Sequence, residues 1–294
     1  MKILVFGGTR FFGKRLVERL VDSGHDVTIA TRGKTSDPFG DRVRRIVLDR
    51  SKRDDLFKLV SKESFDLVYD NIGYSPQDAL YAIQAFKHSM PRYIFTSSLS
   101  VYPNKGRVLG ESDFDCTHYE TVFGDRDDFD YGQGKKLAEA VFFQKAPFPV
   151  AAVRFPIVLG PDDYTKRIQF HLKRIEAGRE IGLVNEDAEI GFISSFEAAR
   201  FLEWIGTETD LTGPINAASE GTISLAELMQ LFSDTLGKSA IIEEVTEDED
   251  ESPFDIEKSY YLDTSRAKEA GFVFEKLENW LPELVRELAN RKDY

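Results

Sequence analysis

The sequence MKILVFGGTRFFG, residues 1–13, decides the fold. Its apolar run from Ile3 to Phe6 has the length of a buried strand, and apolar residues then recur at helical spacing from Phe12 until Gly24. A glycine-rich turn between a strand and a helix can present backbone N–H groups to a phosphate at the helix N-terminus. The stretch therefore predicts a strand, a phosphate-binding turn and a helix.

The turn departs from the usual G-x-G-x-x-G frame at one position. Gly8 and Gly13 match, but Arg10 replaces the middle glycine that lets the backbone approach the phosphates. An arginine can itself contact phosphate through its planar fork of donors. The alternative is a tight turn that binds nothing. The residues expected to form the cofactor loop are Gly7, Gly8, Thr9, Arg10, Phe11, Phe12 and Gly13.

Short apolar runs and helical patterns alternate through the first half of the chain. The runs expected as buried strands are Ile3 to Phe6, Val27 to Thr31, Arg45 to Leu48, Leu67 to Tyr69, Tyr93 to Thr96 and Val150 to Val153. Such alternation predicts an α/β fold with a doubly wound parallel sheet, the Rossmann arrangement.

Beyond Gly160 the pattern becomes less regular. It predicts a helix from about Tyr164 to Ala177, a short apolar run from Ile190 to Ile193 and an amphipathic helix from Ser224 to Leu236. We expect residues 1–160 to form a dinucleotide-binding domain. Residues 161–294 should form a smaller substrate lobe, with some segments returning to the first domain.

Two charged segments in the second half have open roles. Residues 243–251 carry seven Asp or Glu side chains, whose repulsion predicts a solvated surface loop in preference to a mobile lid. The pairs Lys166 with Arg167 and Lys173 with Arg174 repeat at seven-residue spacing. A solvated basic face is favoured over a clamp for a substrate phosphate or carboxylate.

Composition excludes several classes of protein. The net charge of -13 over 294 residues disfavours binding to nucleic acid or to an anionic membrane. The single cysteine and four scattered histidines predict no disulfide and no metal site. No signal-peptide pattern or run of 18 apolar residues is present, so we expect a cytoplasmic protein.

The end of the second predicted strand bears on the choice of dinucleotide. An NAD site usually places Asp or Glu there on the ribose 2′-hydroxyl, whereas this chain has Arg32 followed by Lys34. Arg32, with help from Arg10 or Lys34, would attract a 2′-phosphate, so NADP is favoured over NAD. The alternative is an ordinary surface arginine on a polar turn.

Tyr131 and Lys135 stand four residues apart at the start of a predicted helix, so their side chains share one face. Tyr131 is the only one of the 11 tyrosines with a lysine at that spacing. A lysine ammonium and an oxidised nicotinamide ring both favour phenolate, which would lower the tyrosine pKa towards neutrality. The pair therefore predicts an acid/base catalyst.

Ser98 ends the predicted strand that begins at Tyr93, at the sheet edge where doubly wound folds bind ligands. Its hydroxyl could hydrogen-bond a substrate oxygen while Tyr131 exchanges a proton. The alternative is a serine-rich strand exit that is satisfied by its own backbone.

These features together resemble the short-chain dehydrogenase/reductase superfamily, in its extended or atypical NAD-dependent epimerase/dehydratase branch. The matching stretches are Gly7 to Gly13, Leu48-Asp49, Thr96-Ser97-Ser98 with Val101-Tyr102, and Tyr131 with Lys135. Weaker similarity continues through residues 154–161, 192–193 and 213–216. The resemblance thus covers most of the chain.

The resemblance implies that Tyr131 is the catalytic acid/base, that Lys135 anchors the nicotinamide ribose and lowers the tyrosine pKa, and that Ser98 orients the substrate. It also places Asp49 near the adenine. The further cofactor-binding residues expected are Arg50, Asn71, Ile72, Gly73, Ser97, Phe155 and Ile157. Leu99-Ser100 replaces the Asp-Glu pair of sugar-nucleotide dehydratases, which favours epimerase or reductase chemistry on a nucleotide-sugar-like substrate.

The Gly-Gly-Thr-Arg-Phe form of the loop is also similar to that of chloroplast stem-loop-binding proteins, an atypical branch linked to RNA. A non-catalytic dinucleotide-binding protein with a regulatory or RNA-associated role is therefore the second hypothesis. Asp162, Tyr164 and Arg167 lie where the substrate lobe should begin and are the expected substrate residues. The partner should be a small molecule, and a homodimer is left open.

Overall fold

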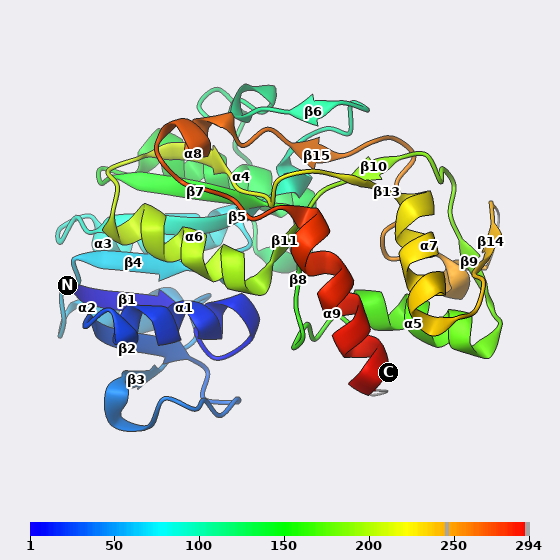
Figure 1. Cartoon of the computed structure of the whole chain (residues 1–294). Coiled ribbons are helices and arrows are strands. Elements are labelled where there is room, and N and C mark those ends of the chain that lie inside the picture. Colours follow the sequence, from blue (N-terminus) through cyan, green and yellow to red (C-terminus); the bar gives the residue numbers. More distant parts are fainter. Residues whose placement is uncertain (245–246, 292–294) are drawn as a thin grey trace.

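A seven-stranded parallel sheet runs through the computed structural model, which describes residues 1–244 and 247–291 (Figure 1). Its strands, in the order in which they lie side by side, are β12 (Gly213–Asn216), β7 (Val150–Phe155), β5 (Arg92–Ser98), β4 (Leu67–Asp70), β1 (Lys2–Phe6), β2 (Asp26–Thr31) and β3 (Arg44–Val47). This order reverses between β1 and β4. In such sheets the crevice at the carboxyl ends of those two strands is the place where ligands bind.

The six strands expected from apolar runs are all confirmed, with ends within a few residues of the predicted ones. Their side chains are largely buried because helices cover both faces of the sheet. β12 was not predicted as a strand. It has only four residues, includes Gly213 and Pro214, and lies at the sheet edge, where a proline is tolerated.

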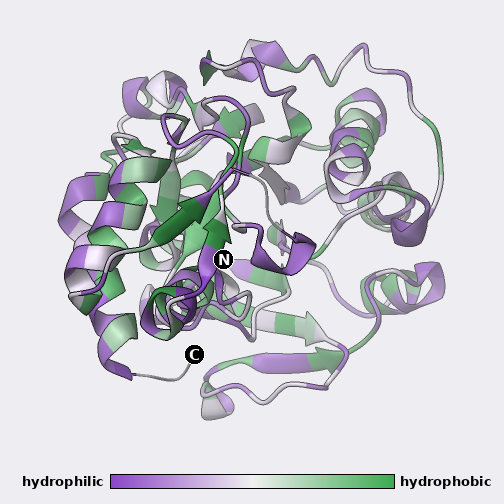
Figure 2. Cartoon of the chain, turned by 90° about the vertical axis from the view of Figure 1, so that its right-hand side faces the viewer, coloured by the Kyte–Doolittle hydropathy of each residue, from purple (hydrophilic) through white to green (hydrophobic). Residues whose placement is uncertain are grey.

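Helices cover the two faces of the sheet in separate apolar layers. One layer includes Leu16 and Leu20 of one helix and Phe201 of another, and the opposite layer includes Ala82 and Val141. On the first face lie α1 (Phe11–Asp22), α6 (Ser195–Thr207) and α8 (Ser265–Glu269), and on the second face lie α2 (Arg53–Val60), α3 (Pro76–Phe86) and α4 (Tyr131–Lys145). Figure 2 shows the hydrophobic colour concentrated on the strands in the middle of the molecule, with both colours on the surrounding helices.

Side-chain caps fix where several helices begin. Ser75 and Asp78 form a reciprocal capping box at α3, and Asp130 accepts a hydrogen bond from the backbone of Gln133 at α4. Ser194 caps α6 in the same way. These caps place the first turns of α3 and α4 beside the carboxyl edge of the sheet.

The second lobe is built on a separate apolar cluster, drawn at the right of Figure 1. Its helices are α5 (Arg167–Ala177), α7 (Leu225–Leu236) and α9 (Leu277–Arg291). The predicted helix over 224–236 is confirmed, whereas α5 begins three residues later than expected. The boundary after residue 160 stays a prediction, and α6 and β12 from beyond it pack on the central sheet.

Short strands join the loops of both parts. They are β6 (Val108–Leu109), β8 (Ile157–Leu159), β9 (Glu180–Gly182), β10 (Glu189–Ile190), β11 (Phe192–Ser194), β13 (Ile223–Ser224), β14 (Ile241–Glu243) and β15 (Tyr261–Leu262). Single-turn 3-10 helices are η1 (Gly40–Arg42), η2 (Leu99–Val101), η3 (Glu111–Asp113), η4 (Arg126–Asp128) and η5 (Asp248–Asp250).

The acidic segment is attached to the second lobe through Arg174. This side chain is buried, forms an ion pair with Asp250 and donates hydrogen bonds to the carbonyl groups of Glu249 and Glu180. Arg174 was expected either on a solvated basic face or in a clamp for substrate. Both expectations are wrong for this residue, because its guanidinium is buried against the acidic segment. Residues 245 and 246 of the acidic segment lie outside the described residues.

Within the described ranges, every helix falls short of the length and apolar character that a membrane crossing requires.

Candidate functional site

The glycine-rich turn lies at the carboxyl end of β1, where the strand order reverses. Gly7 has a φ of +80°, which favours glycine. A Cβ added to Gly13 would lie 2.3 Å from the carbonyl oxygen of Gly7, and one added to Gly8 would lie 2.7 Å from Val17 Cγ2. These close approaches require glycine at the three positions, because the turn packs tightly against α1 and the residues after β4.

Arg10 adopts an extended backbone, with φ of −137° and ψ of 154°. Any residue can adopt this conformation, which explains why the replacement of the middle glycine is tolerated. The residue in the left-handed region is instead Phe11, with φ of 51°. Its ring is buried and packs edge-on against Phe12 and Tyr164, at centroid distances of 5.8 and 6.2 Å.

The N-terminus of α1 has no side-chain cap and no acidic residue in its first turn. The first N–H groups of a helix lack intrahelical partners and attract anions, so this end of α1 is suited to a phosphate.

Asn71 faces the turn from the end of β4. Its Oδ1 accepts a hydrogen bond of 2.8 Å from Thr96 Oγ1, whereas its buried Nδ2 has no partner in the described chain. A Cβ on Gly13 would lie 3.4 Å from that Nδ2, so the unused donor points towards the turn. Ile72 contacts the same turn, because a Cβ on Gly7 would lie 2.5 Å from Ile72 Cγ2.

The expected adenine end contains Arg32 after β2 and Asp49 after β3. The pKa of Asp49 is lowered, first by the hydroxyl of Ser51 and also by the charge of Arg32. Arg32 and Lys34 are exposed. The two strand ends therefore place a cation and a carboxylate near each other.

Arg50, expected to contact the cofactor, has its guanidinium in a buried ion pair. Its Nε donates to Asp70 Oδ2 at 2.9 Å and its Nη1 to the carbonyl of Asp78 at 2.9 Å. Burial alone would raise the pKa of Asp70, but the charge of Arg50 lowers it overall. The side chain of Arg50 thus holds β4 against α3.

Ser98 and Tyr131 meet at the carboxyl edge of the sheet. Ser98 is the last residue of β5 and Tyr131 is the first residue of α4. About half of Tyr131 is exposed. Burial of its hydroxyl end raises the tyrosine pKa, while hydrogen bonding to Ser98 opposes the rise. The expected lowering by Lys135 is not observed in the protein's own environment.

Lys135 lies one turn further along α4 and is almost completely buried. Its Nζ donates hydrogen bonds of 2.7 Å to the carbonyl oxygens of Gly73 and Thr96. Burial lowers its pKa to about 7. Since an ammonium has three donors, the two carbonyls leave one N–H for another acceptor.

Two glycines let α4 approach these loops closely. A Cβ on Gly132 would lie 2.8 Å from the carbonyl oxygen of Ser100, and one on Gly134 would lie 2.5 Å from that of Tyr74. Glycine disfavours a helix interior by about 1 kcal/mol relative to alanine. The pattern Gly-x-Gly beside Tyr131 was the available sequence signal for this close contact.

Residues that the sequence did not single out complete the surroundings of Tyr131. Tyr74 lies with its ring centroid 6.0 Å from that of Tyr131, and the guanidinium carbon of Arg126 lies 4.1 Å from the Tyr74 centroid. Tyr164 and Arg167, both expected near the substrate, influence the pKa of Tyr131 as well. No local pattern pointed to Tyr74 or Arg126, because only the fold brings them to this edge.

Asp162, the third expected substrate residue, is held by α1. Its carboxylate accepts two hydrogen bonds from Arg15, at 2.7 Å from Nη2 and 3.3 Å from Nη1. Arg15 Nε also donates to Ser195 Oγ at 3.1 Å. Asp162 therefore connects the segment after β8 to the helix of the glycine-rich turn.

A buried polar network lies behind the carboxyl edge of the sheet, close to Ser98. The hydroxyl of Ser97 donates to Glu139, and Arg154 Nη2 donates to Glu139 Oε2 at 2.6 Å. Arg154 also donates to the Tyr102 hydroxyl at 2.7 Å. The hydroxyl of Ser97, a residue expected to contact the cofactor, therefore donates its hydrogen bond to a buried side chain of the protein. Glu139 lies in the middle of α4, and no local sequence pattern marks it.

The two remaining cofactor candidates are the last residue of β7 and the first residue of β8. Phe155 is buried, with its ring 6.0 Å from that of Phe12, and Ile157 is partly buried in the cluster of the second lobe. Phe155 belongs to the apolar layer on the first face of the central sheet.

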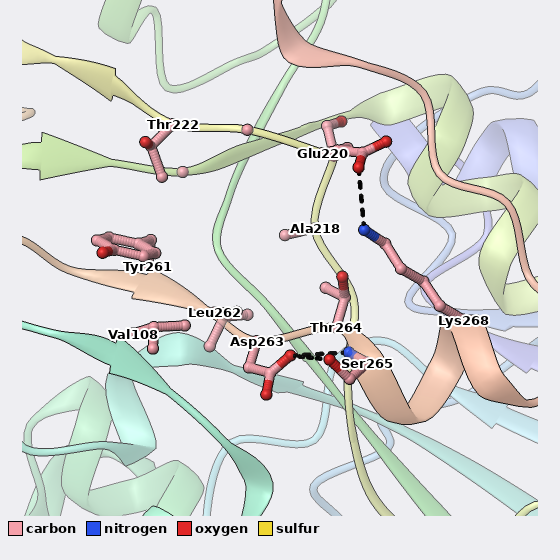
Figure 3. A pocket seen from close by; sticks show the side chains of 13 residues that line it. Val108, Ala218, Glu220, Thr222, Tyr261, Leu262, Asp263, Thr264, Ser265 and Lys268 are labelled. Atoms are coloured by element: carbon pink, nitrogen blue, oxygen red, sulfur yellow. Dashed lines mark hydrogen bonds and ion pairs between the residues drawn. The ribbon is translucent and has the colours of Figure 1, made fainter.

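A pocket of about 240 Å³ lies apart from all of these residues, between the loop after β12 and the segment from β15 to α8 (Figure 3). Glu220 and Lys268 form an ion pair on one side of it, and Asp263 accepts a hydrogen bond from Ser265. These polar groups satisfy one another. None of the expected site residues lines the pocket.

Comparison with known proteins identifies a protein family whose model matches this chain. The model of the NAD dependent epimerase/dehydratase family matches residues 3–217. A curated relative is chloroplast stem-loop binding protein of 41 kDa b from Arabidopsis thaliana, which is 29% identical over 222 residues. The match covers 70% of this chain and 56% of that protein, so the chain spans little more than half of its relative's length.

Solved structures share the fold at low sequence identity. The Bordetella bronchiseptica enzyme WbmG in complex with NAD has a TM-score of 0.76 and 18% identity, covering 100% of this chain and 94% of that one. The UDP-N-acetylglucosamine 4-epimerase of Methanobrevibacter ruminantium M1, in complex with UDP-N-acetylmuramic acid, has a TM-score of 0.74 and 22% identity, covering 98% and 97%.

Proposed function

Because the chain belongs to the NAD dependent epimerase/dehydratase family, we propose that it is an NAD(P)-dependent oxidoreductase or epimerase. Its reaction centre is a carbinol or keto carbon of a nucleotide-sugar-like substrate. The observation that carries this proposal is the meeting of Ser98, Tyr131 and Lys135 beside the glycine-rich turn, at the carboxyl edge of the sheet.

The turn and its neighbours fit a dinucleotide. Gly7 and Gly13 leave no room for side chains, and the N-terminus of α1 has no side-chain cap. The buried Nδ2 of Asn71 points towards the turn and has no acceptor among residues 1–244 and 247–291. These groups would hold the diphosphate. When bound, the nicotinamide ring would supply the hydride acceptor and donor.

In this proposal the phenolate of Tyr131, which a bound oxidised nicotinamide ring would favour, takes the proton from the substrate hydroxyl, and the phenol so formed returns the proton to a carbonyl oxygen. Ser98 hydrogen-bonds the same oxygen and holds it against the phenol. The third donor of Lys135 anchors a ribose hydroxyl, because the other two hold the carbonyls of Gly73 and Thr96. The raised pKa of Tyr131 keeps the phenol protonated, and therefore ready as an acid, in the protein alone.

Replacing Tyr131 with Phe tests this role. The variant should bind the dinucleotide within twofold of the parent and lose turnover by about 10²–10⁴-fold, the usual contribution of general acid/base catalysis. Tyr81→Phe on α3 is the matched control and should keep full activity. Equal turnover in Tyr131→Phe and in the parent would refute the assignment.

NADP is favoured over NAD in this proposal. Arg32 and Lys34 at the end of β2 and Arg10 before α1 are three exposed cations, which suit a 2′-phosphate. Arg32→Ser should raise the dissociation constant of NADP⁺ about tenfold and leave that of NAD⁺ within twofold, with the exposed Arg179→Ser as control. Tighter binding of NAD⁺ by the parent would refute the preference.

A second candidate function is a dinucleotide-binding protein with a regulatory or RNA-associated role. The observation that favours it is the 29% identity to a relative named as a stem-loop binding protein. In that case a stem-loop RNA should bind equally to the parent and to Tyr131→Phe in a mobility-shift assay at physiological salt, and neither protein should turn over a sugar nucleotide.

A further inference from the structure

Lys135 lies between two aromatic rings as well as between two carbonyl groups. Its Nζ is 4.5 Å from the ring centroid of Tyr74 and 4.7 Å from that of Phe95. The carbonyl oxygens of Gly73 and Thr96 accept its two hydrogen bonds of 2.7 Å. An ammonium within about 6 Å of a ring centroid is attracted by the negative face of the ring. Both rings therefore stabilise the charged form of this lysine.

Contacts from three elements fix the ring of Tyr74 beside Lys135. The N–H of Tyr74 donates to Asp78 Oδ2 of α3 at 2.9 Å. A Cβ added to Gly134 of α4 would lie 2.5 Å from the Tyr74 carbonyl oxygen, so the helix touches this backbone. The guanidinium carbon of Arg126 in η4 lies 4.1 Å from the ring centroid.

The carboxylates around Lys135 already form ion pairs with arginines. These pairs are Asp70 with Arg50, Asp78 with Arg50 and Glu139 with Arg154. Burial lowers the pKa of Lys135 to about 7, the charges of the three carboxylates oppose this fall, and the charge of Arg50 adds to it. The ring of Tyr131 lies further away, with its centroid 5.8 Å from Nζ. Near such a pKa, one more contact to the ammonium decides whether the amine keeps its proton at neutral pH.

The proton of Lys135 has a direct consequence for its hydrogen bonds. An ammonium has three N–H donors, of which two hold the carbonyls of Gly73 and Thr96. A neutral amine has only two donors, so loss of the proton leaves none for a ribose hydroxyl. Loss of the charge also removes an attraction that favours phenolate at Tyr131.

We propose that the rings of Tyr74 and Phe95 form an aromatic cage that holds Lys135 in its ammonium form, and that Tyr74 is thereby a positioning residue for dinucleotide binding. The inference rests on the proposed function, in which the third donor of Lys135 binds the ribose. The ring of Tyr74 then sets the pH above which the dinucleotide is lost. Its hydroxyl is not needed for this, so phenylalanine should replace the tyrosine.

The charge of Lys135 is measured in the dinucleotide-free protein by NMR of lysine labelled with ¹³C at Cε, with the signal assigned by its loss in Lys135→Met. Ring currents should shift the Hε protons upfield in the parent, and an ordinary lysine shift would overturn the cage without any further variant. Tyr74→Leu should lower the titration midpoint by about one pH unit, the size of a desolvated cation–π contact. Tyr74→Phe should keep the parent midpoint. Tyr81→Leu, at a partly buried tyrosine that packs in the apolar layer of α3 and α4, should keep it too.

Calorimetry of dinucleotide binding tests the positioning role, with NADP⁺ or NAD⁺, whichever the parent binds more tightly. Tyr74→Leu should bind it about tenfold more weakly than the parent at one pH unit above the parent midpoint. The two proteins should agree within about twofold at 1.5 pH units below that midpoint, where Lys135 is mostly charged in both.

An unchanged midpoint in Tyr74→Leu would overturn the inference. Equal weakening of the dinucleotide at both pH values would also overturn it, because a merely structural effect of the ring does not depend on the charge of Lys135. If the parent binds neither dinucleotide, the proposed function fails and the positioning role with it, even where the midpoint moves as expected.

Discussion

Glu139 and Arg154 form the most deeply buried ion pair in the described chain, with both side chains fully inaccessible. Replacing Glu139 with Gln removes the negative charge and keeps the shape. The guanidinium of Arg154 then stays buried without a counter-ion, because α4, β7 and the loop of Phe114 surround it. Breaking a buried pair by removing one partner typically costs about 3–5 kcal/mol.

The arrangement of Arg154 favours the lower end of that range. Its Nη1 also donates to Tyr102 and to the carbonyl of Glu111, and its Nη2 donates to the carbonyl of Phe114. These acceptors remain in the variant, so we expect a loss of about 3 kcal/mol. That is a large part of the roughly 5–15 kcal/mol by which domains are stable.

Denaturant unfolding monitored by fluorescence and by circular dichroism measures the loss. Glu287→Gln removes one member of an exposed pair with Arg291 and should change the free energy of unfolding by less than about 0.5 kcal/mol. Combining Glu139→Gln with Arg154→Met removes both charges and should recover at least half of the loss. If the free energy of unfolding of Glu139→Gln lies within about 1 kcal/mol of the parent value, other groups compensate the charge of Arg154. That result would refute the prediction.

Three further changes test other parts of the structure. Gly13→Ala forces a Cβ to within 2.3 Å of a backbone oxygen and should lower stability by about 1–3 kcal/mol and weaken dinucleotide binding, whereas Gly110→Ala, with open space around it, should do neither. Burial lowers the pKa of His171 to about 4, so the unfolded chain takes up a proton below pH 6.5 that the folded protein resists. Stability should therefore fall between pH 7 and pH 5 by about 2 kcal/mol more in the parent than in His171→Asn, as measured by urea unfolding, and equal losses would contradict the shift. Arg174→Ala should speed cleavage of the 247–251 segment by a glutamate-specific protease, because this residue holds the segment, while the exposed neighbour Lys173→Ala should leave the rate unchanged.

The strands at the centre of the sheet could be predicted because each is buried on both faces. Consecutive residues of such a strand are apolar, so a short stretch of sequence is enough to recognise it. β12 could not be predicted in this way. Its sequence, Gly213–Asn216, has low strand propensity, and its pairing with β7 is a contact between residues about 60 positions apart. The late start of α5 has a local cause, since Lys166 takes a left-handed φ of 55° directly before the helix.

The candidate catalytic residues could be placed because strand ends and helix starts are local features. The partners of the polar residues could not. Arg50 was expected at the cofactor but turns inward to Asp70, and Asp162 was expected at the substrate but binds Arg15, which is 147 residues away. A sequence shows that a charge is present, whereas the fold alone decides which opposite charge it meets.

The contacts of α1 give the two halves of the site a common support. Phe11, at its start, packs against Tyr164, and Arg15, one turn later, holds Asp162 through two hydrogen bonds. Phe11 adopts a left-handed backbone, which costs about 1–2 kcal/mol in a residue other than glycine and persists only where surrounding contacts compensate. Those contacts are the rings of Phe12 and Tyr164. The backbone of the glycine-rich turn is therefore stabilised in part by the segment that begins the second lobe.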